Sequence, residues 1–164
     1  MPQTDKAEPL SQSLGRITVE THGRGFTDVT GAVRRWLAER RAGDGLLTLF
    51  LRHTSASLTV QENADPDVRA DLLDALDALA PEGRGYRHSL EGPDDMPAHV
   101  KAALTDVSLS VPVFAGAPAL GTWQAIYVVE HRAAPHRREL ALHFLGRFAD
   151  RFRNFVRFAK AVTN

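Results

Sequence analysis

The chain has 164 residues, of which 43% are hydrophobic, and its 20 basic and 20 acidic side chains cancel to a net charge of zero at pH 7. This balance gives no chain-wide attraction to nucleic acid, and the lack of cysteine excludes disulfide bonds, thiolate metal ligands and a cysteine nucleophile. No apolar run approaches the ~20 residues of a membrane span and the polar start has no signal-peptide pattern, so we expect a cytoplasmic protein.

The first elements are predicted to be a tail, a strand and a helix. Residues 1–12 are polar and are expected to form a disordered tail. Alternating apolar positions predict a strand over residues 14–21. Apolar residues at helical spacing over residues 29–37 predict a helix, and Gly43 and Gly45 are expected to end it.

The next strand and helices carry more specific signals. Residues 46–51 form an apolar run typical of a buried strand. Asp65 is placed to cap a helix that has Pro66 in its first turn, and Asp95 is placed to cap a shorter helix over residues 95–104. The apolar stripe of the longer helix, which we expect to be buried, consists of Val68, Leu72, Ala75, Leu76 and Leu79.

The later part of the chain predicts three strands joined by short turns, over residues 109–114, 122–132 and 138–145. Because these turns are too short for crossover helices, we expect a single α+β domain over residues 13–146, with mostly antiparallel sheet packed against two or three helices. Residues 147–164 predict an amphipathic helical extension with a phenylalanine face. This helix would pack on the domain or on a neighbouring subunit, or would present its basic face to a membrane or nucleic acid.

The densest group of hydrogen-bonding side chains lies between the second strand and the first long helix after it. Its members are His53, Thr54, Ser55, Glu62, Asn63 and Asp65. The hydroxyls suit donation to phosphate. The carboxylates and the amide stand just before a helix, where they suit an anion at the helix start or Mg²⁺ held through oxygen. For Asp65 the alternative is an ordinary helix cap.

Two histidines eleven residues apart predict a second cluster. His88 and His99 flank Asp94 and Asp95, and a loop of this length can fold back so that both imidazoles face one divalent ion. A third imidazole, from His53, would leave one coordination position open. The alternative is that these histidines are ordinary capped or surface residues.

Trp123 and Gln124 stand at the start of a predicted strand. An indole and an amide in this position suit stacking and hydrogen bonding of a flat heterocycle. The alternative is that Trp123 belongs to the core. Charged residues near the end of the same strand suit a structural ion-pair cluster or a phosphate site; they are Glu130, Arg132, Arg137 and Arg138.

Four motifs occur in the same order as in a known family. They are His53-Thr54-Ser55-Ala56, Glu62-Asn63-Ala64-Asp65, His88 with Glu91-Gly92-Pro93-Asp94-Asp95-Met96-Pro97-Ala98-His99, and Gly121-Thr122-Trp123-Gln124. The chain therefore resembles the YjbQ family, described as secondary thiamine-phosphate synthases, over about residues 14–146. The resemblance implies a compact α+β domain that assembles into a homotrimer. It also implies a histidine-lined site that holds a divalent metal ion, zinc or magnesium.

The resemblance also assigns roles to residues. The metal ligands would be His88, His99 and His53. The catalytic group would consist of His53, Glu62, Asn63, Asp65 and Asp95. The substrate-binding group would consist of Thr54, Ser55, Trp123 and Gln124.

The implied reaction joins hydroxymethylpyrimidine diphosphate to a thiazole phosphate and releases pyrophosphate, so the expected partner is a small phosphorylated metabolite. Two other classes remain open, a metal-dependent hydrolase of a phosphorylated small molecule and a non-catalytic metabolite-binding protein. Members of the family end near the residue that is 146 here, so residues 147–164 form an extension.

Overall fold

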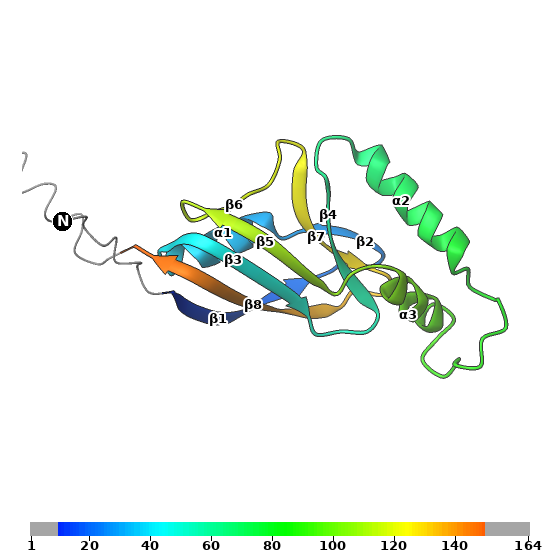
Figure 1. Ribbon diagram of the computed structural model, residues 1–164. Helices are drawn as coiled ribbons and strands as arrows, with labels where there is room; N and C mark the ends of the chain where they lie inside the picture. Colours follow the sequence, from blue (N-terminus) through cyan, green and yellow to red (C-terminus); the bar gives the residue numbers. More distant parts are fainter. Residues whose placement is uncertain (1–9, 150–164) are drawn as a thin grey trace, which may run out of the picture.

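Two antiparallel β-sheets and three helices make up the computed structural model, which describes residues 10–149 (Figure 1). The larger sheet has the strand order β1 (Ser11–Glu20), β8 (Arg137–Phe148), β3 (Ala42–Leu51), β5 (Ser108–Phe114) and β6 (Ala117–Pro118). The smaller sheet has the order β2 (Gly25–Asp28), β7 (Gln124–Glu130) and β4 (Ala56–Glu62). The helices are α1 (Thr30–Glu39), α2 (Pro66–Leu79) and α3 (Asp95–Leu104). The predicted α+β class is confirmed.

The hydrophobic core lies between the two sheets and α1. Strand residues alternate between inside and outside, so that Leu47, Leu49 and Leu51 of β3 are all buried. From α1, Trp36 packs over Gly15 of β1. A Cβ atom on Gly15 would come within 2.2 Å of Trp36 Nε1, so this contact between helix and sheet requires glycine.

Three connections between the sheets meet at one end of the molecule, which we call the crossing end. They are residues 21–24, 52–55 and 131–136, each of which joins a strand of the larger sheet to a strand of the smaller one. The β-pairing of Ala56 with Glu130 places the start of β4 beside the end of β7 there. α3 packs against β4 (Figure 1), so its side chains lie close to these connections.

The predicted end of the first helix is wrong. α1 ends at Glu39, and the turn that follows is made by Arg41, whose φ is 54°. Gly43 and Gly45 belong to β3 instead. At Gly45 a Cβ atom would meet the Leu145 carbonyl oxygen at 2.5 Å, so this glycine allows close strand approach and does not stop a helix.

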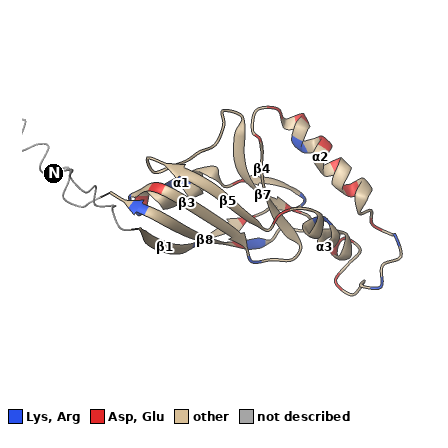
Figure 2. Ribbon diagram, viewed as in Figure 1, with Lys and Arg blue, Asp and Glu red and all other residues tan. Residues whose placement is uncertain are grey.

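The start of α2 is as predicted, because Asp65 Oδ1 accepts a hydrogen bond from the Asp67 N–H at 2.9 Å and Pro66 opens the helix. The predicted burial of its apolar stripe is wrong. No residue of α2 is fully buried, and Leu79 is 59% exposed. The helix stands at the margin of the molecule, and acidic positions recur along it (Figure 2). The spacing of apolar residues correctly predicted a helix, but it could not show how little of the protein packs against the apolar face of that helix.

The predicted disordered tail is wrong at its end, because Ser11 and Gln12 belong to β1. Three further differences from the predictions concern α3, β4 and β8. α3 begins at Asp95, so the residue before it, Asp94, holds the cap position that was predicted for Asp95. β4 occupies a segment for which no strand was predicted. β8 continues to Phe148, and the first two residues of the predicted helical extension therefore belong to a strand; residues 150–164 of that prediction lie outside the described residues, as do residues 1–9. No helix of the described part of the chain has the length and apolarity to cross a membrane.

Candidate metal centre

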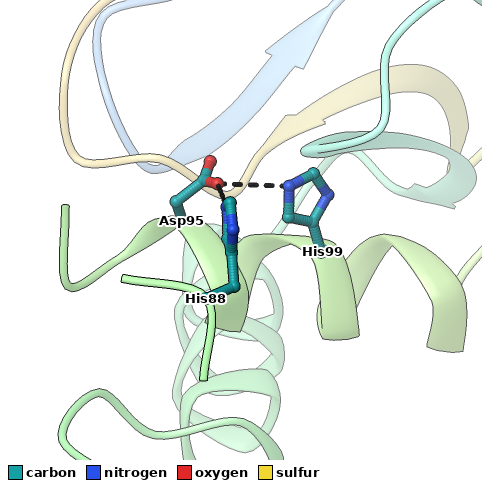
Figure 3. A group of neighbouring side chains, drawn as sticks. All are labelled: His88, Asp95 and His99. Carbon is teal, nitrogen blue, oxygen red and sulfur yellow. Dashed lines mark hydrogen bonds and ion pairs between the residues drawn. The ribbon is translucent and has the colours of Figure 1, made fainter. Parts of the chain in front are cut away.

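His88, Asp95 and His99 come together beside the crossing end (Figure 3). Asp95 and His99 are four residues apart on α3, so they share one face of the helix. The long loop before α3 brings His88 against them. His88 Nε2 lies 2.7 Å from Asp95 Oδ2, and His99 Nε2 lies 3.2 Å from the same oxygen. Within residues 10–149 this is the one group of three such residues whose ligand atoms all lie within 4.8 Å of one another.

The orientation of His99 is fixed by a backbone carbonyl. Its Nδ1 lies 2.9 Å from the oxygen of Thr54, and because a carbonyl only accepts, Nδ1 must donate. In a neutral imidazole Nε2 then carries the lone pair, which points at a carboxylate oxygen of Asp95. Two acceptors at this distance need a proton or a cation between them. A histidine that binds a metal usually donates the N–H of its other ring nitrogen to such a carbonyl oxygen, which fixes the orientation of the ring.

Asp95 is almost fully buried, with 1% of its surface exposed, and is held from its other side. Arg132 Nη1 donates to Asp95 Oδ1, while Arg132 Nε donates to Asp94 Oδ2 at 3.0 Å. Burial opposes the ionisation of Asp95, but the hydrogen bond from His88 and the charge of Arg132 outweigh it and lower its pKa. Asp95 is therefore an ionised carboxylate with Oδ2 directed to the two imidazoles.

The donor set suits zinc better than magnesium. Two imidazoles and one carboxylate are ligands that zinc binds at about 2.1 Å, which places tetrahedral ligands about 3.4 Å apart. The separation of His99 Nε2 from Asp95 Oδ2, 3.2 Å, is near this value, and the separation of His88 Nε2 from the same oxygen, 2.7 Å, is that of a direct hydrogen bond. Magnesium prefers an all-oxygen shell that keeps several waters. Three protein ligands would leave a fourth position for water or substrate.

His53 lies near this cluster but is not part of it. Its Nε2 accepts a hydrogen bond from the backbone N–H of Glu139 at 2.8 Å. Burial and the charge of Arg138 lower the pKa of His53. Together with His99 it lines a hollow of ≈ 550 Å³, whose walls also include Arg52 and Thr54.

The two predicted hydroxyl donors have different surroundings. Thr54 lines the hollow and supplies the carbonyl that orients His99. Ser55 is turned inward, where its Oγ lies 3.2 Å from an Arg138 nitrogen. That guanidinium also donates to Glu130 at 2.5 and 2.7 Å, and Glu130 is completely buried. Of the two alternatives for Glu130 and Arg138, the structure shows the structural ion pair.

The contact of Arg132 with Asp95 and the burial of His131 were not recognisable in the sequence. Arg132 was grouped with neighbouring charges, but no spacing links it to Asp95, the first residue of α3, 37 residues earlier. His131 is buried, and its Nε2 lies 2.9 Å from Ser57 Oγ. Burial, followed by the charge of Lys101, lowers the pKa of His131 to about 4.

The remaining predicted site residues lie at the opposite end of the smaller sheet, which we call the far end. They are Glu62, Asn63, Asp65, Trp123 and Gln124. β4 is seven residues long, so its two ends are about 20 Å apart. Glu62 pairs with Gln124 across the strands, and Trp123 is 64% exposed. Within one chain, these residues do not join the histidine cluster, and Trp123 is not a core residue.

Comparison with known proteins agrees with this architecture. The family model described as "UPF0047 protein YjbQ-like" matches residues 15–147. A UPF0047 protein of Synechocystis sp. is 46% identical over 131 residues, which cover 79% of this chain and 89% of the relative. UPF0047 protein YjbQ of Escherichia coli O157:H7 is 44% identical over 117 residues, 71% of this chain and 85% of the relative. The crystal structure of a hypothetical protein from Aeropyrum pernix K1 superimposes with a TM-score of 0.75 at 33% identity, covering 82% of this chain and 99% of that one.

Proposed function

The chain belongs to the YjbQ-like UPF0047 family, and we propose that it is a metal-dependent enzyme that acts on a small phosphorylated molecule. In this proposal His88, Asp95 and His99 hold a zinc ion. The observation that carries it is the pair of acceptors described above, His99 Nε2 and Asp95 Oδ2, which face each other at 3.2 Å while Nδ1 is committed to a carbonyl.

The residues around the cluster suit metal-assisted hydrolysis. A zinc ion bound there supplies a Lewis acid and a water whose pKa lies near neutrality. Arg132 keeps Asp95 ionised and oriented, and the Thr54 carbonyl keeps the Nε2 lone pair of His99 directed inward. Arg52, in the wall of the adjoining hollow, provides positive charge for a phosphate group.

The test compares three forms of the zinc-loaded protein with p-nitrophenyl phosphate as a general phosphate ester. We expect the wild type to bind one zinc per chain and to release phosphate. His99→Ala should lose both properties, whereas His22→Ala, which changes an exposed histidine outside the cluster, should retain them. Zinc binding and turnover that survive in His99→Ala would contradict the proposal.

A second candidate reaction is the thiamine-phosphate synthesis implied by the family resemblance. It needs charge neutralisation on a leaving diphosphate, which the same metal site would supply. The exposed position of Trp123 at the far end favours hydrolysis over this reaction, because no indole platform lies by the cluster in one chain. Incubation with hydroxymethylpyrimidine diphosphate and thiazole phosphate separates the candidates. Mass spectrometry would show thiamine phosphate for the synthase, dephosphorylated substrate for the hydrolase, and retained but unchanged ligand for a binding protein.

We also propose that copies of the chain associate through the outer face of the larger sheet, as the implied homotrimer requires. Large apolar side chains are exposed on this face; they are Leu14, Leu46, Phe50, Phe114 and Leu145. Leu46 and Leu145 are direct cross-strand partners, so they form one continuous patch. We expect light scattering to give three copies for the wild type and one for Leu46→Lys/Leu145→Lys. A wild-type monomer would refute the assembly.

A further inference from the structure

We propose that His53 is a ligand-binding residue whose neutral imidazole donates its Nδ1–H to an oxyanion in the hollow beside His99. The inference rests on the proposed function for the position of the metal next to that hollow. The hydrogen-bonding state of His53 itself follows from contacts that involve no metal.

The tautomer of His53 is fixed by the backbone of β8. The Glu139 N–H is only a donor, and it lies 2.8 Å from His53 Nε2, so this nitrogen must accept. A neutral imidazole carries a single N–H, which is therefore on Nδ1. Among residues 10–149, Nδ1 of His53 has no hydrogen-bond partner, and it is not among the buried unpaired atoms. The donor is thus free to meet a ligand.

The same contact argues against metal ligation by His53. A nitrogen that binds a metal does so through its lone pair, so ligation by Nδ1 would move the proton to Nε2. The Nε2–H and the Glu139 N–H would then point at each other across 2.8 Å, where there is room for only one hydrogen atom. The predicted role of His53 as a third metal ligand is therefore replaced by that of a hydrogen-bond donor, next to a cluster that already supplies three ligands.

The walls of the hollow define the chemistry of its ligand. Its volume is ≈ 550 Å³, and His53, Arg52 and His99 all line it. Arg52 is half-exposed and shares one nitrogen with Glu139, which leaves other N–H groups available. Ala102, Ala103 and Val107 form an apolar wall. A lining that combines hydrogen-bond donors with apolar residues suits a small molecule with a phosphate or carboxylate group and an apolar body.

Nitrogen-15 NMR of the histidine-labelled protein tests the tautomer. We expect His53 to show a protonated Nδ1 and an unprotonated Nε2, both before and after zinc is added. Titration with inorganic phosphate should shift the Nδ1–H resonance, and titration with acetate in parallel should show whether carboxylate binds as well as phosphate. A proton on Nε2, a zinc-bound Nδ1, or no response to either anion would overturn the proposal.

Two substitutions of His53 distinguish the roles of its two ring nitrogens. Glutamine reaches the Nε2 position and keeps an acceptor for Glu139, whereas asparagine reaches the Nδ1 position and keeps the donor. We expect the phosphate affinity of the zinc-loaded protein to fall about tenfold in His53→Gln and to stay within about threefold in His53→Asn. Zinc affinity should be unchanged in both. Equal phosphate affinity in wild type and His53→Gln would refute the role of the donor.

The outcome for His53 can be told apart from that for the metal. If the wild type binds no zinc, the proposed function fails. The phosphate titration of the metal-free protein then still decides whether Nδ1–H binds an oxyanion, since neither Arg52 nor His53 needs the metal for its position.

Discussion

The crossing end and the far end of the smaller sheet both carry polar segments, yet only at one of them does the fold bury the polar groups together. At the crossing end three connections and α3 bring charged groups from distant parts of the chain into contact, and several are buried: Asp95, Glu130, His131 and Arg138. At the far end Glu62, Asn63 and Trp123 line the margin of a two-strand pairing, and Trp123 is largely exposed. A site is distinguished from a polar turn by the burial of its polar side chains and by their contacts with one another, and not by the number of polar residues in a segment.

The largest expected effect lies in the buried ion pair of the crossing end. Glu130→Gln leaves the Arg138 guanidinium buried without its counter-charge, and breaking such a pair costs about 3–5 kcal/mol. Glu139→Gln is the matched control, because Glu139 is a half-exposed carboxylate that also pairs with arginines, and such pairs near the surface contribute little. Urea unfolding measures both. Equal stability of the two variants would show that the pair at the crossing end is not structurally important.

The next effect concerns the metal and contrasts the two ends directly. Asp95→Asn removes the shared charged ligand, and we expect zinc affinity to fall by about 100-fold or more, since even indirect supporters of a metal site are worth ~10–100-fold. Glu62→Gln, at the far end, should leave zinc affinity unchanged. Competition with a chromophoric chelator gives both constants. A loss in Glu62→Gln would show that the far end takes part in the same site.

Acid sensitivity should also come from the crossing end. The pKa of His131 is lowered to about 4 in the folded protein. As the pH falls below 6.5, the ordinary pKa of histidine, His131 therefore takes up a proton in the unfolded chain but stays neutral in the folded chain. Stability is therefore full above pH ~6.5 and falls as the pH approaches 4, by about 2 kcal/mol at pH 5. Unfolding curves of wild type and His131→Gln, which keeps a partner for Ser57, should converge as the pH is lowered. A stability difference that does not change with pH would argue against this origin.

A smaller effect is expected from the residue that orients the metal ligand. Arg132→Lys keeps the charge but loses the fork that joins Asp94 to Asp95, and zinc affinity should fall about tenfold. Arg137→Lys, a neighbouring exposed arginine paired with Glu20, serves as control and should have no effect. If both variants bind zinc like the wild type, Arg132 has no role in orienting Asp95.

Much of the fold was predictable, because periodicity reports which face of a segment is apolar. The strands around Leu47 and Val111 were found in this way, whereas the start of α2 at Pro66 was predicted from the Asp65 cap and the proline beside it. β4 was missed because its polar residues were interpreted as a site, and the exposure of α2 was missed because an apolar stripe does not show what covers it.

The candidate site was predicted in part for a related reason. Asp95 and His99 are one helical turn apart, so their meeting is a local property of sequence. Arg132 and the Glu139 N–H reach the site through the pairing of sheets, which no local pattern encodes. Conversely, His53 and Glu62 lie at opposite ends of β4, although only eight residues lie between them in the chain.

The central claim is most directly tested by a crystal structure of the zinc-loaded protein, with diffraction collected on both sides of the zinc absorption edge. We expect an anomalous peak about 2.1 Å from His88 Nε2, His99 Nε2 and Asp95 Oδ2, with the His53 Nε2–Glu139 hydrogen bond retained. An anomalous peak at other residues, or none beside α3 at saturating zinc, would contradict it.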